Sequence, residues 1–396
     1  MLKLSKTVSL NLPLMLLLIS YGFVSLGQLQ RVQLSNQVAF YLHDIFLCFF
    51  VIGTGLSYRR SLSRLVKSSW KKSKALRLLG YFFIWAFFGL LINQLFFEGN
   101  YLPWLYWLRL TIYLSTGFLM NQLKNEEKQF HQWLTIFFIL AITSFLFFGF
   151  LQYLLIPDLR FIGGLGWDVH YFRLAGSVLD PNFLGMILVT GLLVWLFAIA
   201  KNTNWRIAGG LIFILALLLT YSRSSYGAFL LTVGFYFLLN RRGQITDKVK
   251  KSLLILSFIF ITLIPFLPKP GGLGVDLART ETVQSRAEVN KSIVKSIKPK
   301  DLVIGRGLFV PTVNLEETNR IVHASFPDNI LVFILISTGI PGLLIFGGFI
   351  YQLVLDYFQK TGLKLLLLIA IMGHSMFNLT LLEPINLLML LLALQI

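Results

Sequence analysis

The chain has 396 residues, of which 56% are hydrophobic, 15% aromatic and only 13% charged. This composition excludes a soluble protein and indicates a polytopic membrane protein. The formal net charge of +18 would suit a nucleic-acid-binding protein, but the basic residues gather between apolar runs. That placement indicates membrane orientation and anionic headgroups, and we expect no nucleic acid partner. One cysteine, Cys48, lies in an apolar segment, so the sequence has no thiol cluster for a metal.

Apolar runs long enough to cross a hydrocarbon core of ~30 Å follow one another along most of the chain. They occupy residues 8–27, 37–57, 78–97, 104–120, 133–156, 183–200, 207–221, 225–240, 252–268, 329–358, 365–382 and 384–396. The pattern predicts an all-α bundle of about 12 transmembrane helices. Because the last run is short, an 11-span version stays open. Gly339 to Gly342 interrupt the run at 329–358, which predicts one kinked helix or a re-entrant piece followed by a span.

The basic residues give the chain an orientation. Lys and Arg concentrate in alternate short loops, whereas the loops on the other side contain few. The basic loops are residues 1–7, 58–77, 121–132, 201–206, 241–251 and 359–364. By the positive-inside rule these loops are cytoplasmic, and so are the N-terminus and the C-terminus. We therefore expect a multi-pass membrane protein with both termini on the cytoplasmic side.

Residues 269–328 form the one long polar stretch, and the alternation places it outside. The spacing of Arg279, Val283, Arg286 and Ile293 predicts a helix with both arginines above a partly apolar stripe. We therefore predict three parts: transmembrane helices in 1–268, an exterior loop domain in 269–328 with an amphipathic helix, and C-terminal transmembrane helices in 329–396.

Ionisable residues inside apolar runs are costly and tend to mark sites. His43, Asp44 and Arg109 lie toward the predicted outer ends of their runs. For His43 and Asp44 an interhelical hydrogen bond and a functional role stay equally open. His374 lies near the middle of its run, and Asp356 reads as a carboxylate at headgroup level.

Two short motifs stand at predicted exterior helix ends. Ser222 to Ser225 separate two apolar runs with no room for a loop, so Arg223 is presented among hydroxyls at the membrane surface. A guanidinium fork matches phosphate oxygens bidentately, so this motif suits phosphate binding, although an arginine that anchors a helix end is the alternative. Asp180-Pro181-Asn182 predicts an ordinary helix start, with Asp180 as the cap.

Several catalytic signatures are absent from the sequence. It contains no Asp-x-Asp pair, no Walker loop, no HExxH and no G-x-S-x-G motif. We therefore expect no metal site and no cofactor. Exterior arginines without a metal cluster suit the handling of a lipid-linked diphosphate at the outer membrane face.

The order of several motifs resembles the O-antigen ligase and polysaccharide polymerase superfamily, over roughly residues 170–390. The residues concerned are Arg173 to Asn182 ending in Asp-Pro-Asn, Leu219 to Ser224, Ser285-Arg286, Gly305-Arg306-Gly307, His323 to Asn329, and Ser337 to Leu343.

The resemblance implies a membrane glycosyltransferase of the bacterial cytoplasmic (inner) membrane, related in fold to the GT-C class. Its donor would be an undecaprenyl-diphosphate-linked oligosaccharide and its reaction would need no metal. Arg223 and Arg286 would bind the diphosphate and stabilise the leaving group. The further substrate-binding residues that we expect are Arg279, Arg173 and Asn329. The family often has histidine directly before the asparagine, whereas this chain has Asp328-Asn329, so the acid/base role stays open between His323 and Asp328.

Within the superfamily we expect a polymerase that joins repeat units. Members that glycosylate proteins tend to carry additional C-terminal sequence, whereas this chain stops directly after its last apolar run. The alternatives are a ligase that transfers the glycan to a lipid or protein acceptor and, from a different class, a flippase of lipid-linked oligosaccharides. A flippase should line both membrane halves with polar groups and show repeated halves, and the sequence shows neither clearly. Membrane lipids and other polysaccharide-assembly proteins are the further partners that we expect.

Overall fold

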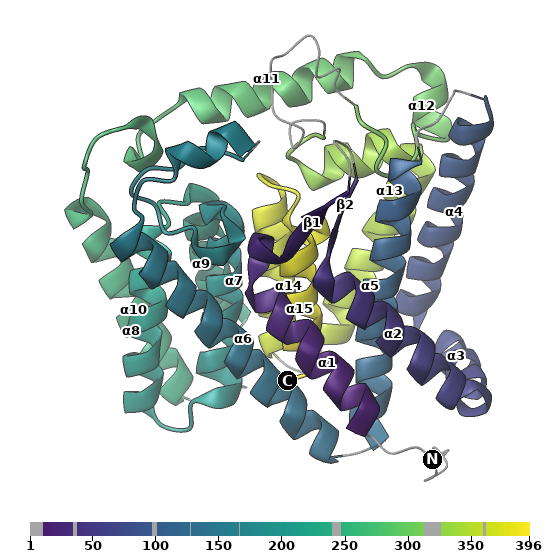
Figure 1. Ribbon diagram of the computed structural model, residues 1–396, viewed down its shortest axis with the longest axis horizontal. Helices are drawn as coiled ribbons and strands as arrows, with labels where there is room; N and C mark the ends of the chain where they lie inside the picture. The colour runs from purple at the N-terminus through teal and green to yellow at the C-terminus, as the bar shows by residue number, and fades with distance from the viewer. Residues whose placement is uncertain are drawn as a thin grey trace. The chain divides into compact units, whose positions relative to one another are not determined.

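The computed structural model describes residues 11–34, 38–96, 101–126, 128–165, 167–239, 247–312, 326–358 and 362–396. These residues are overwhelmingly α-helical (Figure 1), which confirms the predicted all-α class. The chain divides into two compact units, each assembled from separate stretches of sequence. Unit 1 comprises residues 1–20, 32–130 and 281–359, and unit 2 comprises residues 21–31, 131–280 and 360–396. The predicted boundaries at 268 and 328 stay a prediction.

Unit 1 contains long helices and one short hydrogen-bonded pair of strands. Its elements are most of α1 (Asn11–Ser25), β1 (Arg31–Gln33), which begins in unit 2, β2 (Ala39–Tyr41), α2 (Leu42–Ser57), α3 (Arg59–Lys72), α4 (Lys74–Phe96), α5 (Leu102–Glu126), α11 (Glu281–Lys295), α12 (Pro299–Val303) and α13 (Ile330–Phe358). α4 packs along α13, and α2 packs against α5. The helix predicted around residues 279–297 is confirmed as α11.

Unit 2 is built around α7, whose side chains from Leu184 to Val194 are all buried. Its elements are η1 (Gly27–Gln30), most of α6 (Lys128–Leu155), η2 (Arg160–Leu165), η3 (Gly176–Val178), α7 (Pro181–Val194), the π-helical η4 (Trp195–Ile199), α8 (Thr203–Leu219), α9 (Arg223–Leu239), α10 (Asp247–Leu263), η6 (Ile264–Phe266), η7 (Leu273–Val275), α14 (Gly362–Ser375), η10 (Thr380–Leu382) and α15 (Pro384–Ala393). α8, α9, α14 and α15 pack around α7, so this apolar helix needs no polar face.

Every predicted apolar run contains a helix. Among the described residues, five helical segments are long and apolar enough to cross a membrane, and α2 with α3 forms a sixth candidate with a bend of 100°. Four apolar helices are shorter than this test requires, and they correspond to α1, α8, α14 and α15. The multi-pass membrane class is therefore supported, whereas the count of about 12 spans and the relation to the GT-C fold stay predictions.

α13 breaks at Gly339, whose φ of 69° is not helical, with Pro341 just beyond it. The predicted interruption is therefore confirmed. Two motifs from distant parts of the sequence meet at this break: the backbone N–H of Arg306 donates to the carbonyl of Ile336 at 2.8 Å, and that of Gly307 donates to Ser337 at 3.0 Å. The Gly305-Arg306-Gly307 segment thus satisfies carbonyls at the break of α13.

Arg306 ties the same segment to α12 and to the end of α11. Its Nε donates to Asp301 at 2.9 Å, and its Nη2 donates to the carbonyl of Ser296 at 2.5 Å. Asp301 is buried and also accepts from the backbone N–H of Lys298, so its carboxylate is fully engaged in holding this turn.

We expect Gly305→Ala to destabilise unit 1 strongly. Gly305 has a φ of +80°, and a Cβ there would stand 2.3 Å from the carbonyl oxygen of Ser337, which is backbone and cannot rotate away. Strain and overlap together should cost about 2–4 kcal/mol. Thermal unfolding of the purified protein in detergent measures the loss. Gly347→Ala in α13 is the matched control, because a Cβ there meets nothing within 4 Å. Equal melting temperatures for both variants would contradict the close packing described here.

Candidate functional site

The motif around Arg223 forms the tight turn between α8 and α9. α8 ends at Leu219 and α9 begins at Arg223, so three residues make the connection, as the sequence predicted. Tyr221 has a φ of 49°, which turns the chain sharply. The hydroxyl of Ser222 accepts from the backbone N–H of Ser225 at 3.3 Å and so caps the start of α9. Arg223 therefore stands in the first turn of a helix.

A buried hydrogen-bond network lies beneath this turn. The side chain of Ser222 donates to Asn182 Oδ1 at 3.0 Å, and that of Ser225 donates to the carbonyl of Asn182 at 3.1 Å. Asn182 is held in turn at the start of α7, where Asp180 Oδ1 accepts from its backbone N–H at 2.6 Å. The predicted helix start at Asp180-Pro181-Asn182 is thus confirmed.

His374 of α14 closes the network from the C-terminal side. Its Nε2 lies 3.0 Å from Ser225 Oγ and its Nδ1 lies 2.5 Å from Thr380 Oγ1. All three side chains are fully buried. Because Ser225 donates its proton to Asn182, a neutral imidazole with its proton on Nε2 fits both of these contacts: it donates to Ser225 and accepts from Thr380.

Asn378 adds a second C-terminal support, since its Nδ2 donates to Ser224 Oγ at 3.0 Å. In the sequence, His374 stood out only as a polar residue in the middle of an apolar run, and nothing marked Asn378 or Thr380. A histidine inside an apolar run was the available signal. Its partner could not be read from the sequence, because Ser225 and His374 are 149 positions apart.

The first residues of the predicted exterior loop fold back onto Arg223. Its Nη1 donates to the carbonyls of Leu277, at 3.5 Å, and of Arg279. The Nη1 of Arg279 donates to the carbonyl of Gly274 at 2.5 Å and to that of Asp276 at 2.8 Å. Both arginines are partly exposed. Two of the predicted substrate-binding residues are therefore neighbours in unit 2.

Arg173 lies in the same region but is buried. Its Nε donates to the carbonyl of Thr220 at 2.9 Å, and its Nη2 lies 3.4 Å from Asn182 Oδ1. A cation at the carbonyl end of α8 also complements the helix dipole. In this structure Arg173 holds the α8–α9 turn, and its direct contact with substrate stays a prediction.

His170 is a further buried histidine near these groups. Burial lowers its pKa to about 4, with Arg173 and Arg279 acting in the same direction against Asp180. Its Nε2 has no hydrogen-bond partner among the described residues. The imidazole is therefore neutral at pH 7.

The other predicted site residues belong to unit 1. Arg286 of α11 pairs with Asp328, with 3.5 Å between Nε and Oδ2, and the two side chains are 36% and 39% exposed. Asn329 caps α13, because its Oδ1 accepts from the backbone N–H of Leu331 at 2.9 Å and of Val332 at 3.2 Å. His323 lies outside the described residues. The structure therefore joins Arg286 to Asp328, whose roles in the reaction stay predictions.

The polar residues of α2 and α5 form interhelical hydrogen bonds. Asp44 accepts from Arg109 Nε at 3.0 Å and from the Tyr113 hydroxyl at 2.5 Å, and His43 Nε2 lies 2.8 Å from that hydroxyl. The structural alternative for His43 and Asp44 is thus present, as expected for polar groups inside a helical bundle.

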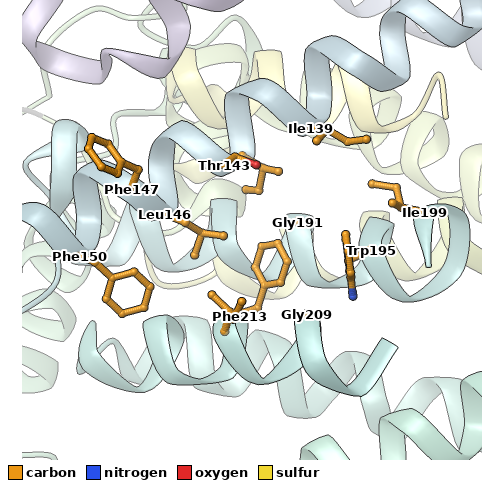
Figure 2. A pocket seen from close by; sticks show the side chains of 12 residues that line it. Ile139, Thr143, Leu146, Phe147, Phe150, Gly191, Trp195, Ile199, Gly209 and Phe213 are labelled. Atoms are coloured by element: carbon orange, nitrogen blue, oxygen red, sulfur yellow. The ribbon is translucent and has the colours of Figure 1, made fainter. Parts of the chain in front are cut away.

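Unit 2 also has an apolar pocket of about 330 Å³ between α6, α7, η4 and α8 (Figure 2). Figure 2 shows Phe147, Phe150, Phe213 and Trp195 around it. The lining offers no charged group. Its chemistry is therefore separate from that of the arginine turn. Among the described residues, no cluster of three or more His, Cys, Asp or Glu side chains stands where it could hold a metal ion.

We expect His374→Leu to lower the stability of unit 2 by about 1–3 kcal/mol, because it leaves the buried hydroxyls of Ser225 and Thr380 short of a partner. Thr380→Val should cost less than the histidine change, and Thr380→Ser should be near neutral because it keeps the hydroxyl. Thermal unfolding in detergent measures each variant. If the two residues act through one hydrogen bond, the double variant His374→Leu/Thr380→Val will cost less than the sum of the single changes. Strict additivity would argue against the network.

The comparison with protein families agrees with the resemblance. A family model described as O-antigen ligase matches residues 208–347. This segment includes the Ser222 to Ser225 turn, Arg286 and the break of α13, whereas Asn182 and His374 lie outside it. No match is found among curated proteins. Residues 208–347 therefore resemble the O-antigen ligase family, which supports the predicted resemblance to the O-antigen ligase and polysaccharide polymerase superfamily.

Proposed function

We propose that this protein is a bacterial polysaccharide polymerase, a membrane glycosyltransferase that joins oligosaccharide repeat units linked to undecaprenyl diphosphate at the outer face of the cytoplasmic membrane. The match to the O-antigen ligase family supports a function of the ligase or polymerase type. The observation that carries the proposal is the turn at Arg223: a guanidinium in the first turn of α9, among three serines and inside the matched segment. Such a helix start suits an anionic phosphate group.

In the proposed reaction, a hydroxyl oxygen of the acceptor sugar attacks the anomeric carbon of the donor. The bond from that carbon to the diphosphate oxygen breaks, and the diphosphate leaves with the bonding electrons. Arg223 and Arg286 neutralise the charge that develops on the leaving group. Arg279 supports the same anion from the segment that contacts Arg223. Arg173 and Asn329 are kept as further substrate-binding candidates.

The proton of the acceptor hydroxyl needs a base, for which His323 and Asp328 are the candidates. A neutral imidazole accepts a proton near neutral pH, which favours His323. Asp328 lies beside Arg286. The ion pair already occupies that carboxylate. The proposed reaction therefore assigns the base to His323 and leaves Asp328 to hold Arg286.

A ligase is the second candidate, because the matching family model carries that description. Ligase and polymerase would share the donor and the leaving group and differ in the acceptor. The surface polysaccharide of a deletion strain, separated on a gel, distinguishes them. Single repeat units on their carrier or anchor indicate a lost polymerase, whereas polymer that accumulates on the carrier indicates a lost ligase. Repeat units retained on the cytoplasmic side would indicate a flippase and overturn both enzymatic candidates.

The proposal requires α11 to lie outside and α3 to lie in the cytoplasm. In a Cys48→Ser background, Ser285→Cys on α11 should react with a membrane-impermeant thiol reagent added to intact cells, and Ser69→Cys on α3 should not. Labelling after the cells are permeabilised is the control for accessibility of both positions. The reverse pattern, with Ser69→Cys labelled and Ser285→Cys protected, would place α11 in the cytoplasm and contradict the proposal.

We expect Arg223→Lys and Arg286→Lys each to reduce polymer formation about tenfold or more, because lysine keeps the charge but loses the planar fork that grips two phosphate oxygens. The amount of each variant in the membrane should be unchanged. Binding of a short polyprenyl diphosphate to the purified protein measures the donor step directly. If both lysine variants formed normal polymer and bound the polyprenyl diphosphate normally, the planar forks of Arg223 and Arg286 would not be needed to bind the diphosphate.

The same purified system tests the base. His323→Ala should abolish transfer, by about 100-fold or more, while binding of the polyprenyl diphosphate survives. Asp328→Asn should be milder, because it removes the partner of Arg286 and no proton acceptor. If His323→Ala turned over donor at the normal rate and Asp328→Asn did not, the base would be Asp328.

A further inference from the structure

α3 (Arg59–Lys72) gathers four of its six basic residues on one side of the helix. At about 3.6 residues per turn, four basic positions share one sector. They are Arg60, Arg64, Lys67 and Lys71. The opposite side contains the apolar residues Leu62, Leu65, Val66 and Trp70, together with Arg59 and Lys72 at the two ends of the helix. α3 contains no acidic residue, so its own sequence does not neutralise this charge.

The helix is fixed to the end of a predicted span. Trp70 packs against Gly80 and meets the ring of Tyr81 edge-on at 5.8 Å, both on α4. The Nη1 of Arg77 donates to the carbonyls of Trp70 and Lys71 at 2.9 and 2.7 Å, which closes the C-terminal end of α3. α3 is therefore held at a set angle beside α4 (Figure 1).

That angle fits an α3 that lies along the membrane surface. Residues Ser61–Lys72 bend by 100° away from Leu42–Ser57 of α2. If α2 crosses the bilayer, an axis nearly perpendicular to it lies in the membrane plane. α3 itself is too basic and too short to cross. Val66 on the apolar side is 42% exposed, and Arg64, Lys67 and Lys71 on the other side are exposed as well.

We propose that α3 is an interfacial helix that binds the anionic headgroups of phospholipids in the leaflet at the predicted cytoplasmic surface. Its apolar side enters the boundary between headgroups and acyl chains, and its basic side meets the phosphates and other anionic groups. Long Lys and Arg side chains reach headgroup level from such a position. The proposal concerns unit 1 alone and does not depend on glycosyl transfer.

The test uses the full-length protein with Cys48→Ser and Val66→Cys, labelled at residue 66 with a small fluorophore. The protein is placed in nanodiscs of phosphatidylcholine and phosphatidylglycerol, and the acyl chains of one lipid or the other are brominated. Bromine quenches the fluorophore by contact, so the two quenching ratios report which lipid surrounds α3. We expect brominated phosphatidylglycerol to be enriched about threefold or more over its bulk fraction, because several basic residues act together.

Arg64→Gln/Lys67→Gln/Lys71→Gln should abolish the enrichment while quenching by both lipids continues. Lys248→Gln/Lys250→Gln/Lys251→Gln at the start of α10 is the matched control, because it removes the same charge from exposed lysines on the same predicted side. Raising the salt concentration should weaken the enrichment in the unaltered helix, since screening shortens the range of electrostatic attraction.

Three results would overturn the proposal. Equal quenching by the two lipids in the unaltered helix would mean that α3 has no preference for anionic headgroups. Absence of quenching by either lipid would place Val66 outside the bilayer and favour an acidic protein as the partner. Equal loss of enrichment in the α10 control would assign the effect to net charge and not to α3.

Discussion

The hydrocarbon of a membrane offers no water to a polar side chain, so each polar group inside it needs a partner within the protein. Ser225 and His374 meet this requirement for each other, although 149 positions separate them in the sequence. Their hydrogen bond joins α9 to α14, and Asn182 extends the chain of bonds to α7. The turn that carries Arg223 is therefore fixed by hydrogen bonds from the first turn of α9 to two other helices, α7 and α14.

This dependence explains why the family segment is not the whole site. Residues 208–347 contain Arg223 and its neighbouring serines, but two of the supports lie outside: Asn182 precedes the segment and His374 follows it. A buried serine without its partners would cost free energy comparable to a lost hydrogen bond. The geometry of the arginine turn is thus a property of unit 2, and a search for functional residues in this chain has to include α7 and α14.

Local features were predictable from the sequence because their causes are local. Apolar runs located the helices, Asp180-Pro181 marked the start of α7, and Gly339 with Pro341 marked the break of α13. Contacts between distant segments were not predictable. The sequence placed Arg173 among the substrate-binding residues, and nothing in its neighbourhood indicated that its guanidinium would meet the carbonyl end of α8.

The docking of Gly305-Arg306-Gly307 onto α13 was hidden for the same reason. A single sequence records no pairing between residues that lie far apart, so two motifs can be recognised separately without any sign that they touch. In the structure the two bonds from residues 306 and 307 satisfy carbonyls that the break of α13 leaves open. The glycine at 305 is therefore explained by close backbone approach at the break, and a phosphate-binding loop is not needed to account for it.

The ion pair between Arg286 and Asp328 bears on how the donor binds in the proposed reaction. Both side chains are more than a third exposed, and exposed pairs of this kind contribute only about 0–1 kcal/mol. An incoming diphosphate carries more charge than one carboxylate and offers oxygens for a bidentate contact, so it competes well for the guanidinium. Under the proposed function, donor binding at Arg286 therefore loosens Asp328. The role proposed for Asp328 is consistent with this weak pair: it holds Arg286 before the donor arrives and gives way to the diphosphate at little cost in free energy.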